Sequence, residues 1–247
     1  MDHHTVAAVS ISGSCLDVLG SLYLAYDLLG GPHGPLRLLT RAVTYSILFG
    51  LGYGLGLGLL FGVSAGLATG ITLAIELNRA SGHRDHYSLP WEALFSAIRA
   101  AAFSAALYPQ VGRNFAILYG ILVTAGQMIG YSRGVRPSLR ILLTDVRRFA
   151  RVAVMSTLLR TSGYLAAALI CSRFVRHLDH PWLFATRLGV VTGVVTAVGV
   201  GISPWVESYA DNLPARRMGV VGVVLMFFGF ALQSMQYWIV VLDVRVS

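Results

Sequence analysis

Residues 43–75, VTYSILFGLGYGLGLGLLFGVSAGLATGITLAI, decide the fold, because this stretch contains no charged residue. As one α-helix it would be roughly 50 Å long, whereas the hydrocarbon core of a bilayer is about 30 Å thick and is spanned by about 20 residues. The stretch therefore predicts either one long tilted or broken helix, or two short spanning helices. Glycine weakens a helix, and alternate positions here are glycine: Gly50, Gly52, Gly54, Gly56 and Gly58. We favour a break near Leu55 to Leu57.

The composition agrees with an intramembrane location for the whole chain. Of its 247 residues, 55% are hydrophobic and only 12% are charged, which is too apolar for a water-soluble surface. Two cysteines and so few charges exclude a disulfide-stapled secreted scaffold, a disordered tail and a cytosolic enzyme of familiar type. We therefore predict an all-α, polytopic transmembrane helical bundle that forms a single integral membrane domain over residues 1–247.

Further apolar segments bring the prediction to six to eight membrane segments. They are residues 15–29, 91–108, 115–131, 152–171, 183–202 and 218–242. Only a short turn signal at residues 109–113 separates the second of these from the third, so the two are predicted to form an antiparallel hairpin. Because Arg99 lies at the middle of segment 91–108, we expect one half-inserted helix there.

The basic residues predict orientation and partners. All nineteen are arginine, and the formal net charge is +8. In a membrane protein such an excess typically faces anionic headgroups at the cytoplasmic leaflet, so it does not indicate a nucleic acid partner. The linker 130–152 holds one acid and six arginines: Arg133, Arg136, Arg140, Arg147, Arg148 and Arg151. We expect this linker in the cytoplasm, its residues 139–149 along the lipid headgroups, and the protein in the inner (plasma) membrane of a bacterium.

Ionisable residues inside or beside membrane segments are expensive to bury and are functional candidates by default. Eight residues form this set: Asp17, Asp27, Glu76, Glu92, Arg99, Arg113, Arg160 and Arg187. Two interpretations stay open. The acids and arginines either pair only to neutralise buried charge, or they line a pathway for a substrate or ion. Several of the basic members lie deeper than the acids, which mildly favours an anionic solute or a lipid headgroup.

Glycines recur every four positions in the uncharged stretch and share one helical face: Gly54, Gly58, Gly62, Gly66 and Gly70. Small residues at this spacing allow two helix backbones to approach closely, on which helix association in lipid depends. We favour packing between helices of the same chain. The alternative is a face for self-association or a helix that lines a pore.

The pattern His-x-Asp-His occurs twice, and Pro-Trp follows each copy. Its residues are the candidate metal ligands: His83, Asp85, His86, His177, Asp179 and His180. Imidazole and carboxylate suit zinc and similar ions, but the ligands would have to converge from separate loops, so solvated loops are favoured over a metal site. A weak internal repeat relating residues 33–56 and 179–202 is the alternative to chance similarity between these regions.

No Walker loop, HExxH helix or nucleophile elbow is present. An enzyme is therefore the least favoured class, and no cofactor is expected. The leading prediction is a membrane channel or transporter for a small solute, with an anion favoured. The alternative is a non-catalytic membrane scaffold or regulatory subunit of a larger complex. Besides membrane lipids, the expected partner is a second copy of the chain or another membrane protein.

Overall fold

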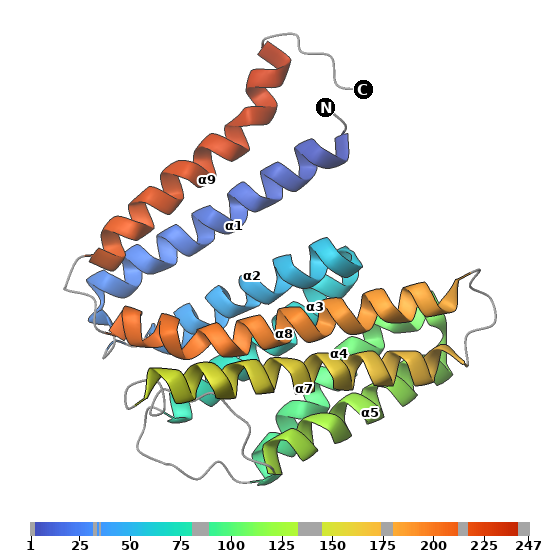
Figure 1. The fold of residues 1–247 in the computed structure, drawn as a ribbon. Helices are drawn as coiled ribbons and strands as arrows, with labels where there is room; N and C mark the ends of the chain where they lie inside the picture. The colour runs from blue at the N-terminus through green and yellow to red at the C-terminus, as the bar shows by residue number, and fades with distance from the viewer. Residues whose placement is uncertain are drawn as a thin grey trace. The chain divides into compact units, whose positions relative to one another are not determined.

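The computed structural model describes residues 3–31, 34, 36–80, 89–132, 145–173, 180–211 and 217–241, and its regular structure there is entirely α-helical (Figure 1). The helices are α1 (His3–Leu28), α2 (Arg37–Leu57), α3 (Leu59–Ala80), α4 (Leu89–Val111), α5 (Arg113–Ser132), α7 (Val146–Ser172), α8 (Pro181–Asp211) and α9 (Arg217–Val241). Six of them, namely α1, α2, α3, α7, α8 and α9, are long and apolar enough to cross a bilayer. The prediction of an all-α polytopic membrane protein is confirmed.

The chain divides into two compact units, residues 1–44 with 210–247, and residues 45–209. In the first unit α1 and α9 pack along each other in opposite directions. A Cβ atom added at Gly20 would lie 2.5 Å from the carbonyl oxygen of Gly222, and one added at Gly222 would lie 2.6 Å from the carbonyl oxygen of Gly20. Gly13 and Gly229 stand in the same reciprocal relation at 2.7 Å. The two helices therefore meet backbone to backbone, at a distance that only glycine permits.

The second unit begins within α2, and most of this helix forms a hairpin with α3. Helices α2 and α3 are separated by Gly58 alone, whose φ of +100° is one that residues with a side chain rarely adopt. The break therefore comes one residue after the predicted Leu55 to Leu57. Across the hairpin, a Cβ atom at Gly62 would lie 2.7 Å from the Cα atom of Gly54, and one at Gly66 would lie 2.5 Å from the Cα atom of Gly50.

The glycine series thus has two structural roles. Gly54, Gly62, Gly66 and Gly70 lie where α2 and α3 contact each other within one chain, with Gly70 against Ser46. Gly58 forms the turn, and a Cβ atom there would meet nothing within 4 Å. The even spacing in the sequence hides this difference, because a turn glycine and a contact glycine look alike.

Helices α4 and α5 form a second hairpin of the same design, as their short link predicts. Gly112 is its turn, with φ +83°. Gly120 of α5 lies against Ser104 of α4, and these two residues are as far from Gly112 in sequence as Gly66 and Gly50 are from Gly58. The two hairpins therefore share a glycine turn and a close contact eight residues to either side of it. The repeat predicted for residues 33–56 and 179–202 begins, in both copies, outside the described residues, and it stays a prediction.

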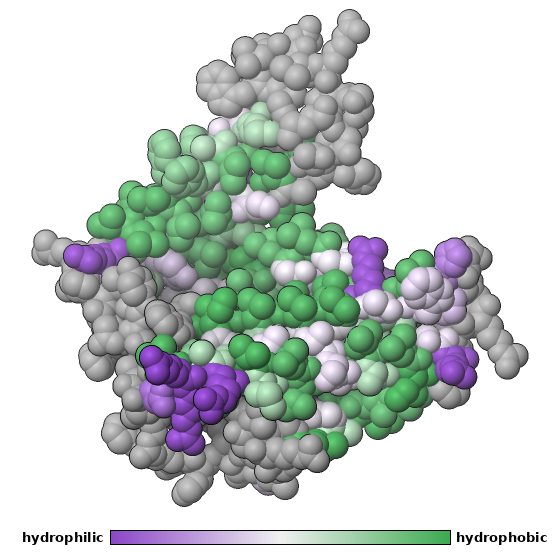
Figure 2. Space-filling view, viewed as in Figure 1, coloured by the Kyte–Doolittle hydropathy of each residue, from purple (hydrophilic) through white to green (hydrophobic). Residues whose placement is uncertain are grey.

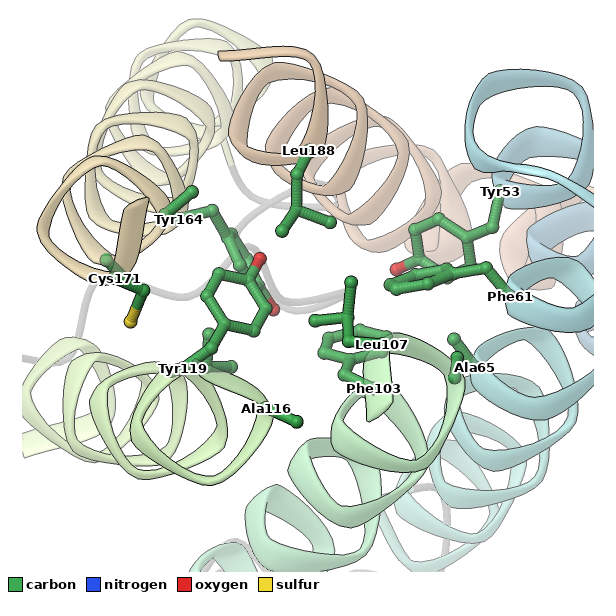
Figure 3. Close-up of a cluster of buried hydrophobic side chains, with 14 of the residues drawn as sticks. Tyr53, Phe61, Ala65, Phe103, Leu107, Ala116, Tyr119, Tyr164, Cys171 and Leu188 are labelled. Atoms are coloured by element: carbon green, nitrogen blue, oxygen red, sulfur yellow. The ribbon is translucent and has the colours of Figure 1, made fainter. Parts of the chain in front are cut away.

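A third pair, α7 and α8, also packs through glycines of its second helix, with Gly189 against Leu165 and Gly193 against Thr161. The three pairs meet at a core of buried aromatic rings (Figure 3). Phe61 of α3 stacks on Phe103 of α4 with ring centroids 5.4 Å apart. Tyr164 of α7 meets the same Phe103 at 6.2 Å. This core joins all three pairs into one unit.

Replacing Gly66 by alanine should lower the free energy of unfolding by about 1–3 kcal/mol, because the added methyl group overlaps the Gly50 backbone. Gly126→Ala is the matched control, since a Cβ atom at Gly126 of α5 would meet nothing within 4 Å, and alanine raises helix propensity by up to about 1 kcal/mol. Unfolding by SDS in detergent micelles, followed by circular dichroism, measures both variants. Equal stability of the two variants would contradict this account of the hairpin.

Candidate functional site

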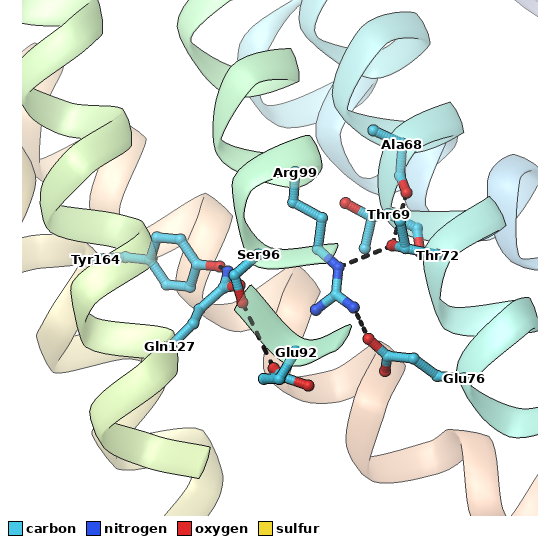
Figure 4. Close-up of polar contacts among 9 residues, drawn as sticks. All are labelled: Ala68, Thr69, Thr72, Glu76, Glu92, Ser96, Arg99, Gln127 and Tyr164. Atoms are coloured by element: carbon cyan, nitrogen blue, oxygen red, sulfur yellow. Dashed lines mark hydrogen bonds and ion pairs between the residues drawn. The ribbon is translucent and has the colours of Figure 1, made fainter. Parts of the chain in front are cut away.

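A buried ion pair joins the two hairpins of the second unit. Glu76 lies near the end of α3 and Arg99 near the middle of α4, and their side chains are only 2% and 7% exposed. Nη2 of Arg99 pairs with Oε1 of Glu76 (Figure 4). The pair connects α3, the second helix of one hairpin, to α4, the first helix of the other, so it lies between the two hairpins.

Thr72 completes this contact from one turn earlier in α3. Nε of Arg99 donates to the Thr72 hydroxyl oxygen at 2.8 Å. The hydroxyl itself donates to the Ala68 carbonyl at 2.7 Å, which turns its lone pairs toward the arginine. Thr72 and Glu76 are adjacent on one face of α3 because they are four residues apart. The guanidinium group is therefore held at two of its nitrogens by a single helix.

A second acid lies on α4 itself. Glu92 is 6% exposed and accepts a hydrogen bond from the hydroxyl of Ser96 at 3.5 Å. Glu92, Ser96 and Arg99 follow the four-then-three spacing of one helical face, so α4 presents both a carboxylate and a guanidinium group to the interior. The structure thus brings together three of the eight candidate ionisable residues, and it places Arg99 in a protein interior.

Hydroxyl groups continue the polar interior beyond these charges. Tyr53 of α2 and Thr196 of α8 are hydrogen-bonded at 2.6 Å. The Gln127 amide of α5 donates to the hydroxyl of Tyr164 on α7 at 2.8 Å. These residues come from four different helices, so polar contacts link all three helix pairs of the second unit.

Two further hydroxyls are fully buried close to this group. Tyr119 and Thr192 are 0% exposed. Their oxygens lie close enough to interact, although neither hydroxyl makes a hydrogen bond of good geometry with a described residue. Figure 3 shows the Tyr119 and Tyr164 hydroxyls directed into the same part of the interior. A buried hydroxyl with unused hydrogen-bonding capacity costs about 1–3 kcal/mol, so this region is polar at the expense of stability.

The other candidates have contacts elsewhere in their own units. In the first unit, Asp17 accepts a hydrogen bond from Nε2 of Gln233 at 2.6 Å, so its partner is an amide rather than an arginine. Asp27 of α1 lies against Gly219 of α9. In the second unit, Arg113 is exposed at the start of α5.

Arg160 and Arg187 have separate local contacts. Nε of Arg160 donates to the Ser156 hydroxyl one turn earlier in α7, at 3.1 Å. Nε of Arg187 on α8 donates to the Gly56 carbonyl at 2.8 Å. Because Gly56 lies in the last turn of α2, Arg187 satisfies a carbonyl that the helix leaves unpaired and adds positive charge at the negative end of its dipole.

Most of the predicted metal ligands, His83, Asp85, His86, His177 and Asp179, lie outside the described residues. His180 is described and directly precedes α8. Within the described residues, no three His, Cys, Asp or Glu side chains form a group that could hold a metal ion. The metal site stays an untested prediction.

The buried hydroxyls were not among the residues singled out from the sequence. Thr192 and Thr196 are four residues apart in an otherwise apolar part of α8, and this spacing was the available signal. Tyr119 has no such signal in the sequence, because a tyrosine in an apolar helix can lie either in the protein core or at the membrane interface.

Comparison with known proteins finds no family model, no curated protein and no solved structure that matches the chain.

Replacing Glu76 by glutamine should lower the free energy of unfolding by about 3–5 kcal/mol, because it leaves the Arg99 charge buried without its carboxylate. The double variant Glu76→Gln with Arg99→Gln should lose less than Glu76→Gln alone. SDS unfolding in micelles measures this cycle, with Arg113→Gln as the control for loss of an exposed arginine. A double variant that loses the sum of the two single effects would show that the two side chains do not interact.

Proposed function

We propose that the second unit is a channel or transporter for a small polar solute. The observation that carries the proposal is the polar interior formed where the helix pairs meet, with the Tyr119 and Thr192 hydroxyls buried and without a hydrogen bond of good geometry to described residues. Ionisable side chains inside membrane bundles typically face the interior and mark the pathway of a substrate or ion, and Glu76, Glu92 and Arg99 lie in this interior.

Stability alone does not account for these side chains. Phenylalanine in place of Tyr119 and valine in place of Thr192 would keep similar shapes while removing hydroxyls that cost free energy when they are buried unpaired. The polar groups also come from every helix pair of the second unit, as the contacts Tyr53–Thr196 and Gln127–Tyr164 illustrate. Polar groups at one shared interface, where apolar side chains of the same shape would fit, support a role in binding a solute.

The contacts also bear on the class of solute. The positive charge of Arg99 is opposed by Glu76 and oriented by Thr72. The polar interior also contains the buried carboxyl group of Glu92. Its other groups are hydroxyls and one amide, which can both donate and accept hydrogen bonds but carry no charge. This arrangement supports a small neutral hydrogen-bonding solute more strongly than the anion favoured by the sequence. The inner (plasma) membrane of a bacterium stays the proposed location, with the arginine-rich linker on its cytoplasmic side.

The double variant Tyr119→Phe with Thr192→Val should reduce solute flux about tenfold or more, because each substitution removes one hydrogen bond of about 1 kcal/mol to the solute. Flux is measured by light scattering of proteoliposomes after mixing with urea, glycerol or, with valinomycin present, potassium formate. The control Tyr108→Phe removes a hydroxyl from a tyrosine that is 59% exposed on α4, and it should leave flux unchanged.

The solutes distinguish the neutral from the anionic proposal. Flux of urea or glycerol without formate supports a neutral pathway, whereas formate flux alone would support the anion. If the wild-type protein carries one of these solutes and the double variant carries it equally fast, the buried hydroxyls are not part of the pathway and the proposed site is wrong.

A second candidate function is a non-catalytic membrane scaffold or regulatory subunit. The closed Glu76–Arg99 pair favours it, since a scaffold would keep its buried charges neutralised. An open groove of about 490 Å³ between α4 and α5 also favours it, because the groove is lined mostly by small residues such as Ala97, Ala101 and Gly120 that allow another helix to approach. This candidate predicts no flux of any of these solutes through the purified, folded chain.

A further inference from the structure

The first turns of α7 carry a concentrated and exposed positive charge. Arg147, Arg148 and Arg151 are all exposed, and the helical spacing places Arg151 beside the other two, because it follows them by three and four residues. Figure 2 shows a strongly hydrophilic group at this end of α7. Within the described part of the chain, no carboxylate contacts these guanidinium groups. The acid next to them, Asp145, caps the helix by accepting from the backbone N–H of Arg148 at 2.9 Å.

The length of α7 places these arginines at the level of the lipid headgroups. The helix has 27 residues, which is about 40 Å, or roughly 10 Å more than the hydrocarbon core of a bilayer. Excess helix must lie in the headgroup layer, and arginine partitions there rather than into hydrocarbon. The three arginines lie within the first six residues of α7, and the length of this segment is close to the excess.

The same side of α7 continues below the arginines as an exposed apolar surface. Val154, Met155, Leu158 and Leu159 follow Arg151 at steps of three and four residues, and they are 43–60% exposed. Cationic groups above an apolar stripe match the two parts of a phospholipid, a phosphate above acyl chains. Guanidinium groups bind phosphate oxygens in a bidentate manner, so this surface is complementary to a lipid in charge and in polarity.

We propose that this side of α7 is a binding site for an anionic phospholipid, whose headgroup phosphate contacts Arg147, Arg148 and Arg151 and whose acyl chains lie on Val154 and Leu158. The site is independent of the proposed transport function, because it lies on the outer surface of α7 and uses none of the buried polar groups. Such a site would retain an anionic lipid at one helix. A basic protein that is merely attracted to a charged leaflet would not.

The test is a titration of the purified full-length protein in a nonionic detergent with phosphatidylglycerol or with phosphatidylcholine of the same acyl chains. Bound lipid is counted by native mass spectrometry. Wild-type protein should bind phosphatidylglycerol at least about tenfold more tightly than phosphatidylcholine. The triple variant Arg147→Gln, Arg148→Gln, Arg151→Gln should lose this preference.

The matched control is the triple variant Arg113→Gln, Arg173→Gln, Arg217→Gln, which removes the same charge from exposed arginines at other helix ends. It should keep the preference for phosphatidylglycerol. Equal loss in both triple variants, or equal binding of the two lipids to the wild type, would overturn the proposal, because the attraction would then be non-specific or indifferent to headgroup charge. Circular dichroism and gel filtration check that each variant is folded.

Two further measurements separate a lipid from a free anion. Val154→Ser with Leu158→Ser should weaken binding of long-chain phosphatidylglycerol at least about threefold while leaving binding of glycerol phosphate unchanged, because only the lipid uses the apolar stripe. Competition by millimolar inorganic phosphate as strong as that by phosphatidylglycerol would overturn the proposal in favour of a simple phosphate site.

Discussion

Direct contact between helix backbones is the constraint on which the rest of this structure depends. Inside a bilayer no hydrophobic effect drives helices together, because lipid chains are as apolar as the side chains they would replace. Close packing must supply the attraction, and glycine permits the closest packing. In both units, glycine lies at the contact between antiparallel helices, as at Gly66 against Gly50 and at Gly20 against Gly222. These contacts set how closely the two helices of each pair lie against each other.

The positions of the polar groups follow from this packing. With α2 and α3 fixed through their glycines, a neighbouring face of α3 presents Thr72 and Glu76 to α4, where Arg99 meets both. The aromatic core around Phe103 then joins the three helix pairs and encloses the Tyr53, Tyr119 and Tyr164 hydroxyls. An ion pair in an interior of low dielectric is stable only in good geometry. The glycine contacts therefore supply the geometry on which the charged and hydroxyl groups depend.

Much of the fold was predictable, because hydropathy and length determine which segments can span a bilayer. Two turns were also predictable. Gly112 between two apolar segments indicated a hairpin, and the glycine-rich stretch indicated a break within one residue of Gly58. The candidate site was predictable only in part. Glu76, Glu92 and Arg99 were recognisable as expensive charges, but their spacing gave no sign of which acid meets which arginine. Tyr119 and Thr192 were missed, because a hydroxyl in an apolar helix looks the same whether it is buried or faces lipid.

By itself, the sequence determined that the chain is an α-helical membrane protein, where its helices turn, and which few side chains carry charge in an apolar environment. These properties depend on local composition and spacing. Only the tertiary structure decided that Arg99 pairs with Glu76 while Asp17 pairs with Gln233, and that the even glycine series contains both a turn and four contacts. Partner choice depends on which helix faces come together. That is a property of side-chain packing between segments far apart in the chain, and no local pattern encodes it.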